Sequence, residues 1–551
     1  MTTTLDVRCI CIQKAKRDTV SDSLTSVLTS YYDEVPYDSH PFPQTAMEHL
    51  EATAFLFGLE TPSPSKARVL ELGCAAGNNL IPFAARHPQA SALGIDLSPV
   101  QIAQGVEAIA QLDLPNVEVR AFDLAEVDES FGQFDYIVCH GVYSWVPGPV
   151  QDAILRVCSQ NLAPDGVAYV SYNVYPGWKA REIVRDAMIL RGGPRDTPGE
   201  KLSYARGMLE FLSQSARPDS VLKKTLDETM PIVRDGAMSY LLHEFLEPCN
   251  APCYFKEFVS RAETHGLAYL ADAEPSTMFV QNYGAQVREP LLRECGGSQV
   301  VMEQYLDFLV NRTFRQTLLV KQDNARSIRY RLDPARLRAL SFAGVFLPDG
   351  GGPLTLDARE QPCTAIRNVK VTFRAPVHKA VAQVLDAHYP AALAPDELVA
   401  LVQTLLGQPR EAIEPLVMAM LEEMLILGAL RIRRTPVQAA TQVSPFPQAA
   451  PSVRNAPGLA PGANGTSAVV CNQWHEAVGL SLLERALLPL LDGTRSHEAL
   501  AEHLVGEVRA DRLRFVRDEA MLTDPAALDT LAREQVALAL RDLRRKALLT
   551  A

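Results

Sequence analysis

The sequence of 551 residues contains no long uncharged apolar run, so it predicts no helix that spans a bilayer. Its first residues lack the basic stretch followed by an apolar segment that marks a secretory leader. An excess of positive charge is also missing, because the net charge is −12. That balance disfavours non-specific binding to nucleic acid or to anionic membranes and favours neutral or cationic substrates. We therefore expect a cytoplasmic protein that inserts into no membrane and binds no nucleic acid.

Two pairs of cysteines at metal-binding spacing are absent as well. The ten cysteines are scattered, and Cys74, Cys139 and Cys158 fall inside apolar runs, where a thiol behaves as a small apolar group. This pattern is typical of a reducing compartment. Cys249 and Cys253 have histidines nearby but no second cysteine pair, so we expect no metal site.

What the sequence does contain is an apolar stretch that ends in a glycine-rich turn, over residues 68–82. Val69 and Leu70 predict a buried parallel strand, and Glu71 lies at its carboxyl end. Glycines in the turn let bare backbone approach a ligand, and the helix that follows presents free amides there. An acidic residue two positions before the first glycine is typical of S-adenosylmethionine sites. The residues predicted to contact this cofactor are Glu71, Gly73, Cys74, Ala75, Gly77 and Asn78.

Two further strands predict the rest of the cofactor pocket. Residues 91–95 lead to Asp96, whose carboxylate can accept hydrogen bonds from both ribose hydroxyls. Residues 117–122 lead to Asp123, which is placed to accept from the adenine amino group. The neighbouring residues predicted to contact the cofactor are Leu97, Phe122 and Leu124, and Phe122 or Leu124 packs on the purine.

The order of strands identifies the kind of sheet. A fourth strand over 134–139 ends at His140 and Gly141, both predicted cofactor contacts, and a fifth strand over 167–172 follows a helix at about 149–161. Successive strands thus end in polar or aromatic side chains at one edge, where open α/β sheets bind ligands. The series predicts an α/β fold with a Rossmann-like class I methyltransferase sheet. A dehydrogenase sheet is the alternative, but the third small residue of its glycine pattern is missing.

Several segments together resemble the bacterial methyltransferases that carry a methyltransferase regulatory domain, including the rickettsial outer-membrane-protein lysine methyltransferases. The resemblance rests on residues 32–44, 73–82, 140–145 and 172–178, and residues 240–267 resemble the regulatory domain itself. It covers about residues 30–290 well. It implies methyl transfer from S-adenosylmethionine to protein lysine side chains, with a segment that includes Tyr32 and Tyr37 lying over the cofactor. A helix cap with exposed tyrosines is the alternative for that segment.

One residue departs from the family pattern, which usually has glycine where this chain has Ala75. An alanine is tolerated there if its φ is negative. We expect weaker cofactor binding, not its loss.

The residues predicted to surround the methyl acceptor are mostly aromatic. Methyl transfer from a sulfonium is an in-line displacement, so the protein supplies alignment and excludes water. A lysine amine must first lose a proton, which costs about 4.6 kcal/mol at pH 7, and burial lowers that cost. The residues expected beside the methyl group are His140, Tyr143, Trp145, Tyr172 and Trp178. For each ring, simple packing is an equal alternative, and for His140 we favour a structural or cofactor-contact role over that of a base.

The length predicts three or four domains. Two small units near the carboxyl end have basic clusters, which we interpret as solvated or protein-docking faces that recognise the substrate or hold a homodimer. The linker before the last unit should be extended and mobile. The predicted divisions are a helical cap (1–65), the core (66–195), a mostly helical regulatory domain (196–295), a middle region (296–360), a winged-helix-like domain (361–435), a Pro/Ala/Gly-rich linker (436–467) and a helical or winged-helix-like C-terminal domain (468–551).

Two alternatives to protein lysine methylation stay open. The core motifs do not identify the acceptor, so a small-molecule methyltransferase is the first. A non-catalytic regulatory protein with a methyltransferase-like core is the second. Methylation of nucleic-acid bases is disfavoured because the segment from His140 to Tyr143 lacks the two prolines that such enzymes place after the fourth strand.

Overall fold

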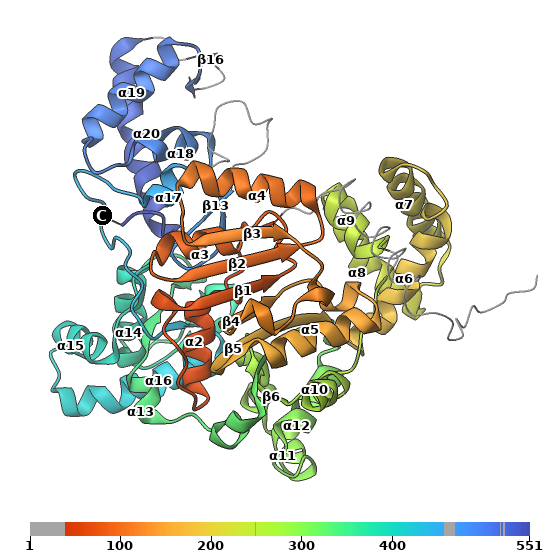
Figure 1. Cartoon of the computed structure of the whole chain (residues 1–551). Coiled ribbons are helices and arrows are strands. Elements are labelled where there is room, and N and C mark those ends of the chain that lie inside the picture. The colour runs from red at the N-terminus through yellow and green to blue at the C-terminus, as the bar shows by residue number, and fades with distance from the viewer. Residues whose placement is uncertain (1–38, 248, 457–468, 518–519, 522–523, 551) are drawn as a thin grey trace, which may run out of the picture.

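The structure is a computed structural model that describes residues 39–247, 249–456, 469–517, 520–521 and 524–550 (Figure 1). Its centre is one mixed sheet flanked by helices, and smaller units follow along the chain. No helix within these ranges is long and apolar enough to cross a membrane.

Seven strands form the central sheet, in the order β3-β2-β1-β4-β5-β7-β6. The first five pair in parallel, whereas β7 runs antiparallel to both β5 and β6. β1 and β4 are buried along most of their length, as expected for apolar strands inside a covered sheet. The predicted Rossmann-like α/β sheet is confirmed. The strand bounds are β1 Arg68–Leu72, β2 Ser91–Asp96, β3 Val117–Ala121, β4 Phe134–Cys139, β5 Leu162–Asn173, β6 Leu267–Asp272 and β7 Phe314–Lys321.

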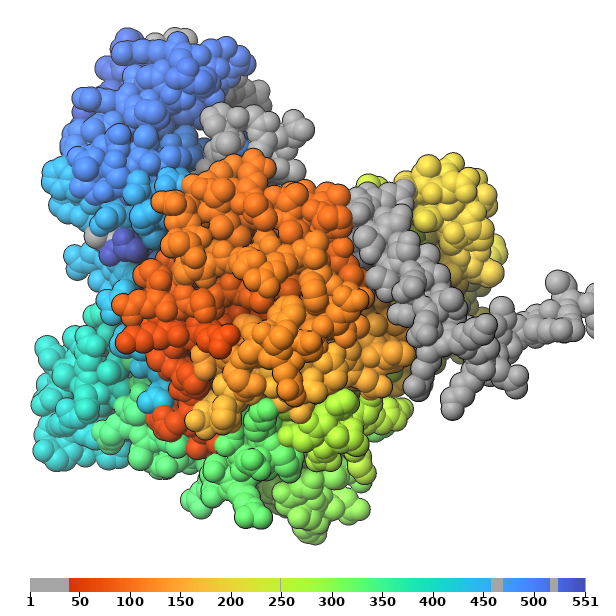
Figure 2. Space-filling view, viewed as in Figure 1, coloured from red at the N-terminus to blue at the C-terminus, as the bar shows by residue number. Residues whose placement is uncertain are grey.

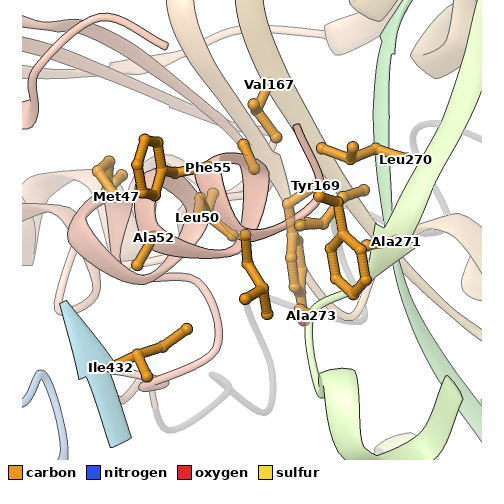
Figure 3. Packing of buried hydrophobic residues seen from close by; sticks show 14 of the residues in the cluster. Met47, Leu50, Ala52, Phe55, Val167, Tyr169, Leu270, Ala271, Ala273 and Ile432 are labelled. Atoms are coloured by element: carbon orange, nitrogen blue, oxygen red, sulfur yellow. The ribbon is translucent and has the colours of Figure 1, made fainter. Parts of the chain in front are cut away.

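The helices of the first half connect or cover these strands. They are α2 Met47–Leu56, α3 Leu80–Arg86, α4 Pro99–Leu112 and α5 Gly148–Gln160. α2 is apolar on several sides and is therefore buried (Figure 3). Its side chains pack against Val167 and Tyr169 of β5 and against Leu270 of β6, and Ile432 lies on its other side. One core thus joins the sheet to residues near position 430.

After β5 the chain forms a group of helices and then adds two more strands to the same sheet. Four helices with a small core of their own come first, namely α6 Gly177–Gly192, α7 Pro198–Ser215, α8 Val221–Asp235 and α9 Met238–Phe245. The chain then forms β6 and β7, each preceded by helices, namely α10 Phe255–Thr264, α11 Ala285–Glu294 and α12 Gln299–Leu309. The sheet therefore takes two strands from beyond residue 195, the predicted end of the core, because a strand's sequence does not show which sheet it joins.

The unit between residues 334 and 433 contains short strands, then three longer helices and a final strand. Its core is continuous with that of the sheet. A further strand, β8, pairs with β12 at the end of the unit. The bounds are α13 Pro334–Arg338, β8 Ser341–Ala343, β9 Phe346–Pro348, β10 Gln361–Ala365, β11 Lys370–Phe373, α14 Pro376–His388, α15 Pro395–Leu406, α16 Arg410–Leu427 and β12 Arg431–Arg433.

The C-terminal unit has a separate core of apolar side chains and lies beside the region of α3 and α4 (Figure 2, blue). Ala440, Ala449 and Val453 are buried in this core, so the first part of the predicted linker is packed and not extended. Residues 457–468 lie outside the described part. The bounds are α17 Pro451–Arg454, β13 Val469–Cys471, β14 Ala477–Gly479, α18 Leu482–Leu487, α19 His497–Arg509, β15 Val516–Arg517, β16 Ala520–Met521 and α20 Pro525–Arg545.

Candidate functional site

The turn after β1 forms the floor of the candidate site. Gly73 and Gly77 both have positive φ, at 75° and 74°. A Cβ atom on Gly73 would lie 2.4 Å from Val142 Cγ2, so only glycine lets this turn approach the segment after β4. Cys74 is buried beneath the turn, and Asn78 is exposed and donates from its side chain to the Ser39 carbonyl at 3.0 Å.

Ala75 adopts the left-handed conformation, with φ at 49°. Ala75 therefore lacks the negative φ that would leave an alanine unstrained. The left-handed conformation costs roughly 1 kcal/mol. Its amide donates to Asp96 Oδ2 at 2.8 Å, which holds the turn in place despite that cost.

Asp96 ends β2 beside this turn. Its Oδ1 accepts from the Ser98 amide at 2.9 Å and its Oδ2 accepts from the Ala75 amide. These two bonds fix the orientation of the carboxylate, whose oxygens act only as acceptors. Leu97, the next residue, is half-buried.

Glu71 is 4% exposed at the end of β1. Its Oε1 accepts from Asn79 Nδ2 at 2.8 Å, and its Oε2 is buried with no hydrogen-bond partner among the described residues. Burial, aided by the nearby Asp96 charge, raises the pKa of the Glu71 carboxyl to about 8. A cation placed at Oε2 would satisfy that atom and favour the carboxylate.

The segment after β3 forms another side of the site. Asp123 caps a short 3₁₀ turn by accepting from the Ala125 amide at 2.8 Å, and it keeps part of its surface exposed. Phe122 is half-buried and packs on Phe131, with ring centroids 5.2 Å apart. Leu124 is buried. The Asp123 oxygen not used by the cap is available to a donor.

His140 follows β4 at the same edge. Its ring lies 4.0 Å from that of Phe42, and its Nδ1 lies 2.8 Å from the Tyr169 hydroxyl. Burial lowers the pKa of His140 to about 4, so the imidazole is neutral at physiological pH. The Gly141 amide donates to Ser171 Oγ at 2.8 Å, and a Cβ on Gly141 would meet nothing within 4 Å, so this backbone borders open space.

The aromatic residues predicted beside the methyl group form a packed layer. Tyr172 is 1% exposed, its ring stacks on Phe258 at 3.9 Å, and its hydroxyl bonds Thr317 Oγ1 at 2.9 Å. Tyr143 is fully buried, and Trp178 is 1% exposed. Trp145 is half-buried and meets Trp178 edge-on at 6.1 Å. Part of the Trp145 ring is therefore accessible to a substrate, whereas the other three rings are buried.

The sequence did not single out Asn79, Phe42, Thr45 or His475. Asn79 Oδ1 accepts from the Phe42 amide at 3.1 Å and lies 2.9 Å from both Thr45 Oγ1 and His475 Nε2. The adjacent Asn78 was named because it stands in the turn, but Asn79 is the buried member of the pair. Tyr32 and Tyr37 lie outside the described residues.

Together these side chains can bind a cofactor that carries hydroxyls, an aromatic base and a cationic end. Asp96 suits the hydroxyls and Glu71 suits a cation, while Asp123 and Phe122 suit a base. His140 is a weak base, because burial lowers its pKa to about 4. Its chemistry is that of alignment and water exclusion.

Three family models match the chain. A methyltransferase domain matches residues 70–168, a predicted methyltransferase regulatory domain matches residues 237–321, and the C-terminal winged helix domain of PKMT matches residues 457–548. The regulatory match includes Phe258 and Thr317, which support the aromatic layer.

Two uncharacterized proteins of Rickettsia prowazekii (strain Madrid E) are similar in sequence. One is 42% identical over 293 residues, which make up 53% of this chain and 53% of that protein. The other is 39% identical over 233 residues, which make up 42% of this chain and 93% of that protein. The alignment therefore spans about half the length of the first relative and nearly all of the second.

A solved structure is similar over almost the whole chain. PKMT2 from Rickettsia typhi aligns with a TM-score of 0.84 and 29% identity, covering 94% of this chain and 100% of that one. The structure of the same protein in complex with AdoHcy aligns with a TM-score of 0.84 and 28% identity.

Proposed function

The chain belongs to the family of methyltransferases that combine a methyltransferase domain with a methyltransferase regulatory domain and a PKMT-type C-terminal winged helix, and we propose that it transfers methyl groups from S-adenosylmethionine to lysine side chains of proteins. The observation that carries the proposal is the Asp96 carboxylate, held beside the glycine turn by the amides of Ala75 and Ser98.

The residues present fit S-adenosylmethionine, which when bound supplies an electrophilic methyl group on a sulfonium. The Asp96 carboxylate, an acceptor beside the glycine turn, suits the two ribose hydroxyls. Glu71 has a buried oxygen without a partner in the described part of the chain, and the cofactor's amino-acid end carries an ammonium that would satisfy it. The AdoHcy complex of the similar rickettsial protein supports the same cofactor class.

Alignment, not acid–base chemistry, is the contribution expected from this chain. Proton transfer from a lysine ammonium to His140, with its pKa of about 4, would cost about 9 kcal/mol. His140 therefore suits a contact to the cofactor or to a neutral amine. The lysine loses its proton to solvent before it enters, and burial against the rings of Trp145 and Trp178 would disfavour its recharging.

A protein substrate and a homodimer are parts of this proposal. The lysine acceptor is supported by the resemblance of residues 30–290 to lysine methyltransferases and by the PKMT match at the C-terminal unit. Exposed apolar side chains on α6 to α9, including Leu190 and Phe211, offer a surface for homodimer formation. Light scattering would detect the dimer by its mass. A cytoplasmic location is supported by the free thiols of the described cysteines.

Calorimetry with S-adenosylhomocysteine tests the cofactor site. Asp96→Ala removes the acceptor of two ribose hydrogen bonds to a charged group, each worth about 1.5–3 kcal/mol, so we expect affinity to fall by about 100-fold or more. The control is Glu107→Ala on the exposed side of α4, which should bind like the wild type. Equal affinity of Asp96→Ala and wild type would mean that the ribose is held elsewhere, and no binding by the wild type would refute the proposed function.

A further inference from the structure

The hairpin of β13 and β14 carries a histidine from the C-terminal unit into the core of the methyltransferase domain. Its turn is held by Asn472 Oδ1, which accepts from the amides of Trp474 and Glu476 at 2.9 Å each. Trp474 is fully buried, and its Nε1 donates to the Pro390 carbonyl at 2.9 Å. These bonds fix the hairpin, so His475 enters the core from a rigid support.

His475 is 1% exposed and bonds residues of the core through both ring nitrogens. Its Nδ1 lies 2.9 Å from Arg86 Nη2 and its Nε2 lies 2.9 Å from Asn79 Oδ1. Because arginine only donates, Nδ1 is the acceptor, and Nε2 must carry the proton and donate to Asn79. Burial, aided by Arg86, lowers the pKa of His475 to about 3, so this neutral tautomer persists at physiological pH.

The bond from His475 helps to fix which way the Asn79 amide faces, together with the donors Phe42 N–H and Thr45 Oγ1 on the same oxygen. An amide has one oxygen and one nitrogen, so an Oδ1 atom that accepts from His475 directs Nδ2 towards Glu71, at 2.8 Å. The same Oδ1 accepts from the Phe42 amide and thereby anchors the segment that places Phe42 against His140. A reversed amide would present two hydrogens to the donors of His475 and Phe42 and would leave Glu71 facing a carbonyl oxygen.

We propose that His475 is a positioning residue for the cofactor site, which acts through Asn79 on Glu71 and on the segment at Phe42 and so couples the C-terminal unit to cofactor binding. The inference rests on the proposed function, because it assumes that the glycine turn binds S-adenosylmethionine. Its structural basis is one continuous chain of hydrogen bonds, from Arg86 through His475 and Asn79 to Glu71.

The coupling is reciprocal, because a C-terminal unit that stabilises the cofactor-binding form must itself be stabilised when the cofactor binds. Hydrogen exchange of the hairpin amides measures this stabilisation. The His475 amide donates to the Asn472 carbonyl and the Asn472 amide donates to the Glu476 carbonyl, both at 3.0 Å. Their hydrogen exchange should slow when S-adenosylhomocysteine is added.

The first experiment measures the affinity of the full chain for S-adenosylhomocysteine by calorimetry. His475→Leu removes both ring bonds, and we expect about a fivefold loss, which corresponds to one buried hydrogen bond. His475→Gln can donate to Asn79 and accept from Arg86, so it should bind within twofold of the wild type. The matched control is Glu476→Gln, which breaks the ion pair of the same hairpin with Arg431 but does not touch Asn79.

The second experiment separates positioning from general support of the fold. In the Asn79→Ala background, His475→Leu should cause no further loss of affinity, because the residue through which it acts is gone. An equal loss in both backgrounds, or wild-type affinity of His475→Leu, would overturn the inference while the proposed function stands. Absence of binding by the wild type would overturn both.

Hydrogen exchange provides a test on the wild-type protein alone, so the result does not depend on whether a variant folds. The inference predicts slower exchange over residues 469–479 in the presence of S-adenosylhomocysteine, with unchanged exchange in α19 as the internal reference. Unchanged exchange of the hairpin, in a protein that calorimetry shows to bind the ligand, would contradict the coupling.

Discussion

Asn79 donates a hydrogen bond to Oε1 of Glu71 at 2.8 Å, while the second oxygen of this buried carboxyl has no partner in the described chain. The arrangement explains why burial can keep the pKa of Glu71 near 8 despite one donor. It also makes Glu71 the group through which pH should act on the cofactor site.

We predict that affinity for S-adenosylhomocysteine rises between about pH 6 and 8. Below pH 8 the free Glu71 carboxyl is protonated, and a bound ammonium requires the carboxylate, so binding must release a proton there. Above the pKa the carboxylate already exists and this dependence ends. Calorimetry in buffers of different ionisation enthalpy measures the released proton, and Glu71→Gln should abolish the release. A pH-independent affinity would show that no cation binds at Glu71.

The left-handed Ala75 leads to a prediction about stability. Ala75→Gly relieves about 1 kcal/mol of strain in the folded state but adds about 0.4–1 kcal/mol of entropy to the unfolded chain, so the free energy of unfolding should stay equal or rise slightly. Ala76→Gly is the control, because Ala76 has no positive φ to relieve and should lose stability. Urea titration compares the two, and equal losses would mean that Ala75 is not strained.

The low pKa of His140 predicts that it is not the base. His140→Gln should leave the shape of the kcat–pH profile between pH 6 and 9 unchanged, since no ionisation of this ring falls in that range. The KM for the cofactor should rise instead, because the ring and its bond to the Tyr169 hydroxyl border the site. Loss of an acidic limb from the profile of the variant would show that His140 does accept the proton.

The buried Tyr172 should act on stability and not on catalysis. Tyr172→Phe keeps the ring stacked on Phe258 and removes the bond to Thr317, so the free energy of unfolding should fall by about 1 kcal/mol with kcat unchanged. Tyr172→Ala should cost about 3–5 kcal/mol. A Tyr172→Phe protein with wild-type stability and a much lower kcat would place the hydroxyl in the reaction.

Local patterns were enough to predict the sheet and to place the candidate cofactor residues at one edge of it. Glu71, Asp96 and His140 each end a strand whose apolar residues are visible in the sequence, and parallel strands bring their carboxyl ends together. The conformation of Ala75 was not predictable, because the same residues allow either sign of φ in a turn.

Long-range contacts account for what the sequence could not show. His475 lies 396 residues from Asn79, and a histidine in a polar hairpin has no pattern that points to a distant asparagine. The burial of Tyr172 depends on Phe258 and Thr317, which belong to α10 and β7. The sequence around Tyr172 gives no sign of this burial, because the covering residues belong to elements that pack on the sheet later in the chain.

The central claim is methyl transfer to protein lysine. The most direct measurement incubates the full chain with S-adenosylmethionine and a lysate of its own organism, and then locates the added methyl by mass spectrometry, with Asp96→Ala as the inactive reference. We predict methylated lysine in one or more proteins with wild type only. A methyl group found on a small molecule, or no methyl product with a wild-type protein that binds S-adenosylhomocysteine, would contradict it.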